Sequence, residues 1–319
     1  MSQTPQTDVI KDAAKTHWVY RAPEGMRPFL QLSRLDRPIG YWLLTLPGWI
    51  GLAFASLSHG FAQSDLKWAV LILIGAIAMR GAGCTYNDIV DQDLDARVER
   101  TALRPLPAGT VSTKQAWVWL LAQCAAGLIV LLILPRLAQI ISLCSIPLVA
   151  AYPFMKRITW WPQLWLGLTF NWAVLVAYAA KTGEISAPLF GLYLGLIFWT
   201  VSYDTIYACQ DKDDDAMIGI KSTARLFGDK LVNHLNIIQG FTVGFMTFAY
   251  VMQVETHPPI ATVAVILISP FFIHLDWQKK KLKSDNPNYL KLFKSNTTAA
   301  ALLIISTISI AILLSLTTT

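Results

Sequence analysis

Two stretches rich in acidic side chains come directly after long apolar segments of the chain. The first runs from Asn87 to Asp95 and contains Asn87, Asp88, Asp91 and Asp95. Read as a helix, it places Asn87, Asp91 and Asp95 at positions i, i+4 and i+8, so their oxygen atoms share one face, with Asp88 beside them. Like charges at this spacing repel each other, and a hard divalent cation such as Mg²⁺ would compensate them. The first stretch therefore predicts a metal site.

The second acidic stretch runs from Tyr203 to Asp215 and also begins inside an apolar segment. Asp211 and Asp215 repeat the spacing of four residues. Proteins commonly hold Mg²⁺ with a few carboxylates together with substrate phosphates. Two acidic faces of this kind predict two metal ions that bind one polyanion, and a diphosphate is the first candidate.

The elements that must position these side chains are membrane helices. Hydrophobic residues make up 54% of the 319 residues and charged residues only 14%, and the mean hydropathy is +0.46. This composition excludes an ordinary soluble domain. The four cysteines lie in apolar segments without a CxxC pair, so neither a disulfide framework nor a zinc site is expected.

Apolar segments long enough to cross a bilayer, about 20 residues each, recur along the chain. They lie near 39–58, 68–87, 115–134, 137–155, 163–181, 187–209, 230–252, 259–277 and 297–316. Residues 1–30 are polar, and we expect them to form a cytoplasmic tail that is neither a secretory signal nor a transit peptide. Residues 31–319 are expected to form a single polytopic domain.

The basic residues predict the orientation of these spans. Of the 26 lysines and arginines, only Lys67, Arg136 and Lys181 lie on the side opposite to the tail, and Arg80 lies within the second span. The positive-inside rule therefore places the N-terminus in the cytoplasm. Because both acidic stretches follow even-numbered spans, they are expected to face the cytoplasm together.

Several basic and aromatic residues are expected near the same face. Arg80 shares one helical stripe with Asn87 and Asp91 and lies eight residues before Asp88, inside the span, where a charge is costly and is usually paired. Tyr152 and Lys156 form another pair four residues apart, followed by Arg157. Solvated loops, or basic residues that only set the topology, are the alternative explanation of each feature.

Four motifs, in this order, resemble those of the UbiA superfamily of intramembrane aromatic prenyltransferases. They are Asn-Asp-x-x-Asp-x-x-x-Asp at 87–95, Arg-Pro-Leu-Pro at 104–107, Tyr-x-x-x-Lys at 152–156 and Asp-x-x-x-Asp at 211–215. The surrounding residues, 151–157, 203–215 and 219–223, resemble the members that act on 4-hydroxybenzoate. The resemblance covers nearly the whole chain after the tail.

The resemblance implies nine transmembrane helices around a central cavity, capped on the cytoplasmic side by the loops after helices 2 and 6. It implies Mg²⁺ as the cofactor and a polyprenyl diphosphate as the donor. The implied metal ligands are Asn87, Asp88, Asp91, Asp95, Asp211 and Asp215. Asp91, Asp211 and Lys156 would be catalytic, and substrate would be bound by Tyr152, Asp204 and one or more of Arg37, Arg80 and Arg157. Asp93, Asp213 and Asp214 would face outward.

The implied reaction transfers a polyprenyl group to the 3-position of 4-hydroxybenzoate, a membrane step of ubiquinone biosynthesis. One of three arginines, Arg37, Arg80 or Arg157, would hold the acceptor carboxylate, and the sequence does not rank them. The chain would lie in a bacterial inner membrane, with the lipid bilayer and no nucleic acid as partner. The alternatives are a related enzyme with another aromatic acceptor or a haem ring, and a secondary transporter of an anionic metabolite.

Overall fold

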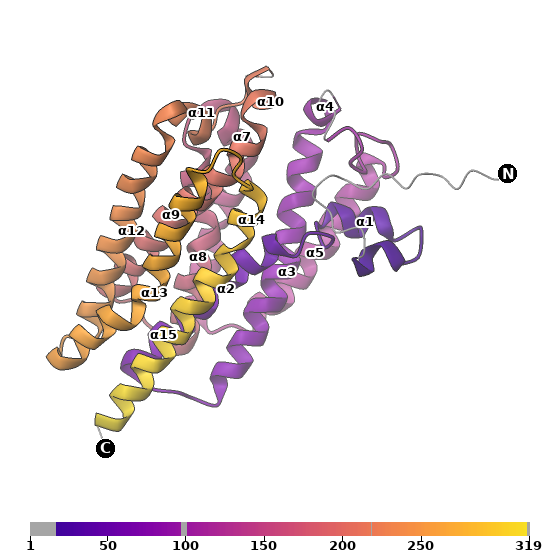
Figure 1. The fold of residues 1–319 in the computed structure, drawn as a ribbon. Coiled ribbons are helices and arrows are strands. Elements are labelled where there is room, and N and C mark those ends of the chain that lie inside the picture. The colour runs from indigo at the N-terminus through magenta and orange to yellow at the C-terminus, as the bar shows by residue number, and fades with distance from the viewer. Residues whose placement is uncertain (1–16, 97–100, 218, 318–319) are drawn as a thin grey trace. The chain divides into compact units, whose positions relative to one another are not determined.

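The computed structural model describes residues 17–96, 101–217 and 219–317, and every regular element in these ranges is a helix (Figure 1). The long helices are α2 (Ile39–His59), α3 (Ser64–Val90), α5 (Thr113–Ile133), α8 (Pro162–Thr182), α9 (Ala187–Ala208), α12 (Leu231–Gln253), α13 (Pro258–Leu282) and α15 (Asn296–Thr317). The short ones are η1 (Trp18–Arg21), α1 (Arg27–Leu32), α4 (Gln92–Asp95), α6 (Arg136–Cys144), α7 (Ile146–Ile158), η2 (Cys209–Asp211), α10 (Lys212–Met217), α11 (Thr223–Phe227), η3 (Gly228–Lys230) and α14 (Tyr289–Lys294). The expected all-α class is confirmed.

Nine stretches of the described chain are long and apolar enough to cross a membrane, which confirms the predicted number. Five of them are single helices, namely α2, α3, α5, α8 and α13. The others join neighbouring helices and run over Arg136–Ile158, Ala187–Asp211, Thr223–Gln253 and Tyr289–Thr317. The chain is therefore a multi-pass membrane protein. Of the predicted tail, residues 1–16 lie outside the described part of the chain.

The chain divides into two compact units. Unit 1 contains residues 1–41 and 74–130, and unit 2 contains residues 42–73 and 131–319. The first acidic stretch belongs to unit 1 and the second to unit 2. The single polytopic domain expected from the sequence stays a prediction.

In unit 1, the segment around α1 packs on the loop that precedes α5. Leu32 of α1 forms a buried cluster with Leu106, Val111 and Ala116. Next to this cluster, Ser33 Oγ donates to Gln123 Oε1 of α5 (3.1 Å) and accepts from Trp119 Nε1 (2.8 Å). These contacts fix the backbone just before Arg34.

In unit 2, α9 lies between α8 and α12 and packs against both (Figure 1). Its side chain Trp199 is fully buried, contacts Tyr203 and Phe271, and donates to Asn296 Oδ1 at 2.9 Å. The hydrogen bond to Asn296 satisfies the indole N–H of Trp199 inside an apolar core. The packing sets the position of the C-terminal end of α9, from which the second acidic stretch continues.

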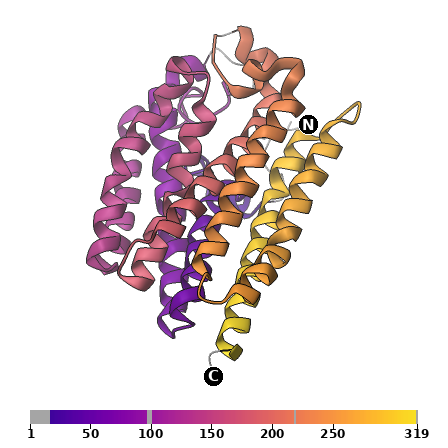
Figure 2. The same ribbon diagram turned by 90° about the vertical axis from the view of Figure 1, so that its left-hand side faces the viewer.

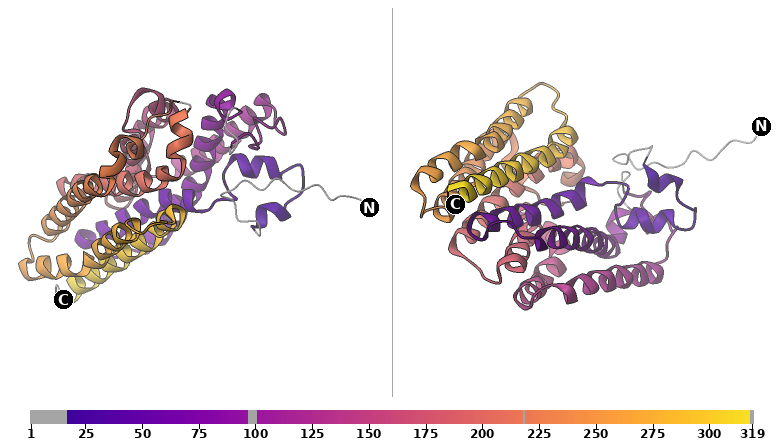
Figure 3. Two further views of the ribbon diagram at one scale, coloured as in Figure 1. Left: turned by 45° about the horizontal axis from the view of Figure 1, so that its top comes forward. Right: turned by 90° about the horizontal axis from the view of Figure 1, so that it is seen from below.

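Close helix packing in unit 2 depends on small residues. A Cβ at Gly51 of α2 would lie 2.6 Å from the carbonyl oxygen of Val174 in α8, so only glycine permits this approach. Further along the chain, α13 and α15 lie side by side (Figures 2 and 3). The small buried residues Ala299 and Ala300 stand at the start of α15. Small residues thus let these helices of unit 2 pack closely.

Candidate functional site

The first acidic stretch is helical but contains a break that the sequence did not predict. Helix α3 ends at Val90, Asp91 has φ −99° and ψ 5°, and α4 begins at Gln92. Backbone hydrogen bonds still run from Asp91 N to Asn87 O and from Asp95 N to Asp91 O. The spacing of four residues survives for Asn87 and Asp91, since Asn87 Nδ2 donates to Asp91 Oδ2 at 3.1 Å. The continuous helix expected through Asp95 is interrupted at Asp91, and the predicted common face of all three residues stays a prediction.

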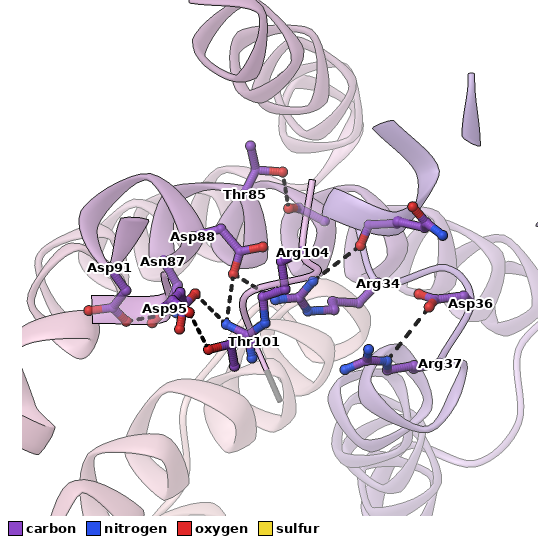
Figure 4. A network of polar contacts seen from close by, with 12 residues as sticks. Arg34, Asp36, Arg37, Thr85, Asn87, Asp88, Asp91, Asp95, Thr101 and Arg104 are labelled. Carbon is purple, nitrogen blue, oxygen red and sulfur yellow. Dashed lines mark hydrogen bonds and ion pairs between the residues drawn. The ribbon is translucent and has the colours of Figure 1, made fainter. Parts of the chain in front are cut away.

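Two arginines meet the carboxylates of this stretch (Figure 4). Arg34 Nη2 lies 2.6 Å from Asp88 Oδ1. Arg104 Nη1 lies 2.5 Å from Asp95 Oδ2 and 3.4 Å from the same oxygen of Asp88. Thr101 Oγ1 donates to the Asp95 carbonyl at 2.7 Å and ties the loop before Arg104 to α4. Neither arginine was assigned a partner from the sequence.

The carboxylates of the first stretch are withdrawn from solvent. Asp88 and Asp91 are fully buried and Asp95 is 7% exposed, whereas Asp93 is exposed, as expected. Arg34 and Arg104 contact two of these three buried carboxylates, and Asp88 Oδ2 is buried without a hydrogen-bond partner in the described chain. Buried carboxylate oxygens of this kind suit a hard cation such as Mg²⁺. Within the described ranges no three His, Cys, Asp or Glu side chains converge as a ready-made metal site, since Asp88 and Asp95 are turned toward the arginines.

Arg34 reaches Asp88 from a strained backbone position. Its φ is +56°, which makes it the one non-glycine residue in the left-handed region among the described residues. This conformation costs about 1–2 kcal/mol for an L-residue. The packing of α1, the hydrogen bonds of Ser33 and the contact of Arg34 Nη1 with the Gln31 carbonyl (3.3 Å) hold it in place. The ion pair with Asp88 is thus part of the folded unit and not a mobile surface contact.

Burial and neighbouring charges oppose each other in this cluster. Burial alone would lower the pKa of the Arg34 guanidinium, but the charge of Asp88 together with those of Asp36 and Asp95 raises that pKa above its ordinary value. The neighbouring Asp36 is also buried, and burial raises its pKa above 3.8, although Arg37 and Arg34 lower it in part. Arg37 Nε lies 3.6 Å from Asp36 Oδ2. Asp36 therefore binds its proton more tightly in the folded chain than in the unfolded chain.

Two of the three candidate arginines for an acceptor carboxylate lie close to the start of α2. A Cβ at Gly40 would lie 2.8 Å from Arg80 Nε, so the guanidinium of Arg80 rests against the first turn of α2. Arg37 precedes this turn and is 13% exposed. Arg157, the third candidate, is exposed at the end of α7 in unit 2. The structure thus places Arg80 beside the segment that carries Arg37.

The second acidic stretch leaves α9 through a short 3₁₀ turn. Asp211 ends η2 and Asp215 lies in α10, and both are half-buried, while Asp213 is exposed. Asp204 is half-buried one turn before the end of α9. The side chain of Asp214 lies outside the described part of the chain. Asp211 and Asp215 thus lie in two successive short helices, and their predicted common face stays a prediction.

A short return segment ties the second stretch to the Tyr-x-x-x-Lys motif within unit 2. Lys221 N donates to the carbonyl of Lys156 at 3.0 Å, and Lys221 Nζ donates to the carbonyl of Ile158 at 3.1 Å. Both Tyr152 and Lys156 are half-buried on α7. The backbone of the motif is therefore held next to the segment that follows Asp215.

Arg225 closes this return segment and was missed in the sequence. Its Nη1 donates to the carbonyls of Asp215 (3.3 Å) and Ile220, and its guanidinium lies 5.4 Å from the ring of Trp160. The sequence signal that could have indicated it is Ser222, the N-cap residue of α11. The Ser222 side chain accepts from Arg225 N and fixes the start of the helix that carries Arg225. One arginine thus fixes the backbone on both sides of the turn after α10.

The profile of the UbiA prenyltransferase family matches residues 44–297. The chain belongs to this family. The match contains all four motifs, from Asn87 to Asp215. Family membership favours the enzyme prediction over the transporter alternative.

Individual members agree with this assignment. The 4-hydroxybenzoate polyprenyltransferase of rat mitochondria is 45% identical over 251 residues, which are 78% of this chain. The chain spans 66% of that relative's length, just under two thirds. A UbiA homolog from Aeropyrum pernix K1 is 25% identical with a TM-score of 0.64 over 84% of this chain and 98% of the homolog. A UbiA homolog from Archaeoglobus fulgidus, bound to GPP and Mg²⁺, is 17% identical with a TM-score of 0.64 over 89% and 99%.

Proposed function

We propose that the chain is an Mg²⁺-dependent prenyltransferase that moves a polyprenyl group from an all-trans polyprenyl diphosphate to the 3-position of 4-hydroxybenzoate, as in ubiquinone biosynthesis. The observation that carries the proposal is the 45% identity to a curated 4-hydroxybenzoate polyprenyltransferase over 78% of the chain. The buried carboxylates of the first acidic stretch support it independently, because they supply the oxygen donors that a metal-bound diphosphate needs.

In this proposal the two acidic stretches hold the donor diphosphate through Mg²⁺. The ligands would be Asn87, Asp88, Asp91, Asp95, Asp211 and Asp215, while Lys156 and Tyr152 would contact diphosphate oxygens. When bound, Mg²⁺ neutralises the negative charge that develops on the leaving diphosphate. Asp88 already has Arg34 as a close partner, so its contribution is expected to be weaker than that of Asp91.

The chain's own residues would organise the rest of the reaction. The allylic C–O bond breaks, the diphosphate leaves with the electron pair, and the ring carbon ortho to the phenol attacks the allylic cation. The proton lost from the ring would pass to a carboxylate, for which Asp211 is the candidate. Arg37, Arg80 or Arg157 would hold the acceptor carboxylate, and the contact between Arg80 and the first turn of α2 favours Arg80 together with Arg37. An apolar central cavity under a cytoplasmic cap would keep water from the cation.

The proposed location is a membrane with the N-terminus on the cytoplasmic side, supported by the asymmetric distribution of lysine and arginine. The bacterial inner membrane expected from the sequence has no support in the comparisons, because the curated relatives are mitochondrial proteins. The acceptor, an aromatic acid, and the donor, a polyprenyl diphosphate, are the proposed partners besides the lipid bilayer.

Product formation in isolated membranes tests the proposal. Membranes that contain the chain are given 4-hydroxybenzoate and polyprenyl diphosphates of several lengths, with Mg²⁺ or with EDTA. We expect 3-polyprenyl-4-hydroxybenzoate with Mg²⁺ and none with EDTA. Equal product formation in EDTA would contradict the proposed role of Mg²⁺. The absence of product from folded protein would contradict 4-hydroxybenzoate as the acceptor.

A further inference from the structure

We propose that Arg104 is a tethered counter-cation that competes with the divalent metal for Asp95 and so sets the metal affinity of the first acidic stretch. This inference rests on the proposed function, since it concerns the same metal site. It assigns a role to an arginine that no sequence signal linked to Asp95.

The position of the Arg104 guanidinium carries the inference. Its Nη1 lies 2.5 Å from Asp95 Oδ2 and 3.4 Å from Asp88 Oδ1, and the side chain is 13% exposed. A charge-assisted hydrogen bond of this length occupies the carboxylate oxygen that a metal would use. Metal and arginine therefore cannot both take the same position on Asp95.

Arg34 and Arg104 reach the carboxylates from segments that are held in different ways. Arg34 Nη2 lies 2.6 Å from Asp88 Oδ1, and the packing of α1 and the Gln31 carbonyl fix this arginine. The Nε of Arg104 is buried without a hydrogen-bond partner in the described chain. Its backbone is set in a turn by a hydrogen bond from its N to the carbonyl of Thr101. In this proposal Arg34 stays with Asp88, and the side chain of Arg104 moves away from Asp95 while its backbone keeps this turn.

The charge balance gives the direction of the effect. Arg104 contacts both Asp95 and Asp88, whereas Arg34 contacts Asp88 at 2.6 Å. A divalent cation at Asp95 would stand beside the guanidinium of Arg104, and like charges repel strongly in a partly buried site. Binding of the metal should therefore release Arg104, and removal of Arg104 should tighten metal binding. Loss of an ordinary ligand would have the opposite effect.

The direct test measures binding of Mn²⁺, used in place of Mg²⁺, to the full chain in detergent micelles without any prenyl diphosphate. Electron paramagnetic resonance of free Mn²⁺ gives the dissociation constant. For Arg104→Gln we expect about tenfold tighter binding, as follows from the loss of one charge-assisted competitor. Arg104→Lys keeps a cation within reach of Asp95 and should stay within about threefold of the wild type.

Lys114→Gln is the control for overall charge, because it removes one positive charge of unit 1 from an exposed position on α5. It should change the Mn²⁺ affinity much less than Arg104→Gln. If both variants bind Mn²⁺ equally more tightly than the wild type, overall charge explains the effect and the proposal is overturned. Weaker or unchanged Mn²⁺ binding in Arg104→Gln would also overturn it. If the wild type itself binds no Mn²⁺, the proposed metal site fails, which is a separate result.

A second measurement needs no variant and covers the case in which Arg104→Gln does not fold. Phenylglyoxal modifies accessible arginines, and mass spectrometry locates the modified residues in the wild-type chain. We expect Mn²⁺ to increase modification of Arg104 and to leave Arg34 unchanged. Protection of Arg104 by Mn²⁺, or no change, would contradict its release.

Discussion

Arg34 and Asp88 form a buried ion pair across 54 positions of sequence, with 2.6 Å between Nη2 and Oδ1. The pair joins the segment after α1 to the end of α3. Asp88 is fully buried and Arg34 is 10% exposed, so neither side chain has water to replace its partner. The first acidic stretch of unit 1 is therefore held by a contact that the N-terminal segment supplies.

Removal of either partner of this pair should destabilise the chain strongly. Asp88→Asn and Arg34→Gln each leave a buried charge without its partner, which typically costs about 3–5 kcal/mol. The double variant should cost clearly less than the sum of the two, because the residues are in contact. Unfolding by SDS in mixed micelles, followed by circular dichroism, measures these free energies. Strict additivity would show that the pair contributes no coupling energy.

Asp36 should make stability depend on pH. Burial raises its pKa above 3.8 in the folded chain, so the unfolded chain loses this proton first. The folded state consequently loses stability as the pH rises from about 3.8 through the raised pKa. Asp36→Asn cannot lose a proton, so its unfolding temperature relative to the wild type should increase with pH across this window. A constant difference between the two proteins from pH 4 to 7 would contradict the raised pKa.

Gly40→Ala should reveal whether Arg80 holds the acceptor. The new Cβ would lie 2.8 Å from Arg80 Nε and must displace the guanidinium, which is the flexible end of its side chain. We expect the KM for 4-hydroxybenzoate to rise about tenfold with a smaller change in kcat, because acceptor binding loses a charge-assisted contact.

Gly83→Ala is the matched control for this experiment, since a Cβ at Gly83 meets nothing within 4 Å. Its kinetic constants should stay close to those of the wild type. An unchanged KM in Gly40→Ala would move the assignment from Arg80 to Arg37 or Arg157.

Arg225 should act through the position of Asp215. Arg225→Ala leaves the carbonyls of Asp215 and Ile220 without this donor and loosens the turn after α10. We expect kcat/KM to fall about 10- to 100-fold, as a small misplacement of a catalytic group can do, and the Mg²⁺ concentration for half-maximal rate to rise. Arg225→Lys should recover part of both effects. A normal Mg²⁺ requirement in Arg225→Ala would leave only a general structural role.

The spans could be predicted from sequence because each apolar segment is long enough to cross the bilayer and ends at polar residues or turns. The spacing of Asn87 and Asp91 could be predicted because local helix geometry decides it. The break at Asp91 could not, since the residues around it have ordinary helical spacing. It appears where Asp88 and Asp95 turn toward Arg34 and Arg104.

Contacts between distant segments were also beyond the sequence. The basic residues Arg34 and Arg104 fit the positive-inside rule, which explains a charge near the membrane without naming its partner. The left-handed backbone at Arg34 had no signal either, because glycine and not arginine usually marks that conformation. The roles of the metal and diphosphate ligands stay predictions.

The comparison of Asp91 with Asp93 tests the central claim most directly. Asp91 is fully buried and accepts from Asn87, whereas Asp93, two positions later, is exposed. The rate of formation of 3-polyprenyl-4-hydroxybenzoate is measured over a series of Mg²⁺ concentrations for the wild type, Asp91→Asn and Asp93→Asn at matched amounts of folded protein. The account predicts at least a 100-fold loss in Asp91→Asn, equivalent to about 2.7 kcal/mol of transition-state stabilisation, and a nearly normal rate in Asp93→Asn. Full turnover in Asp91→Asn, with an unchanged Mg²⁺ requirement, would contradict it.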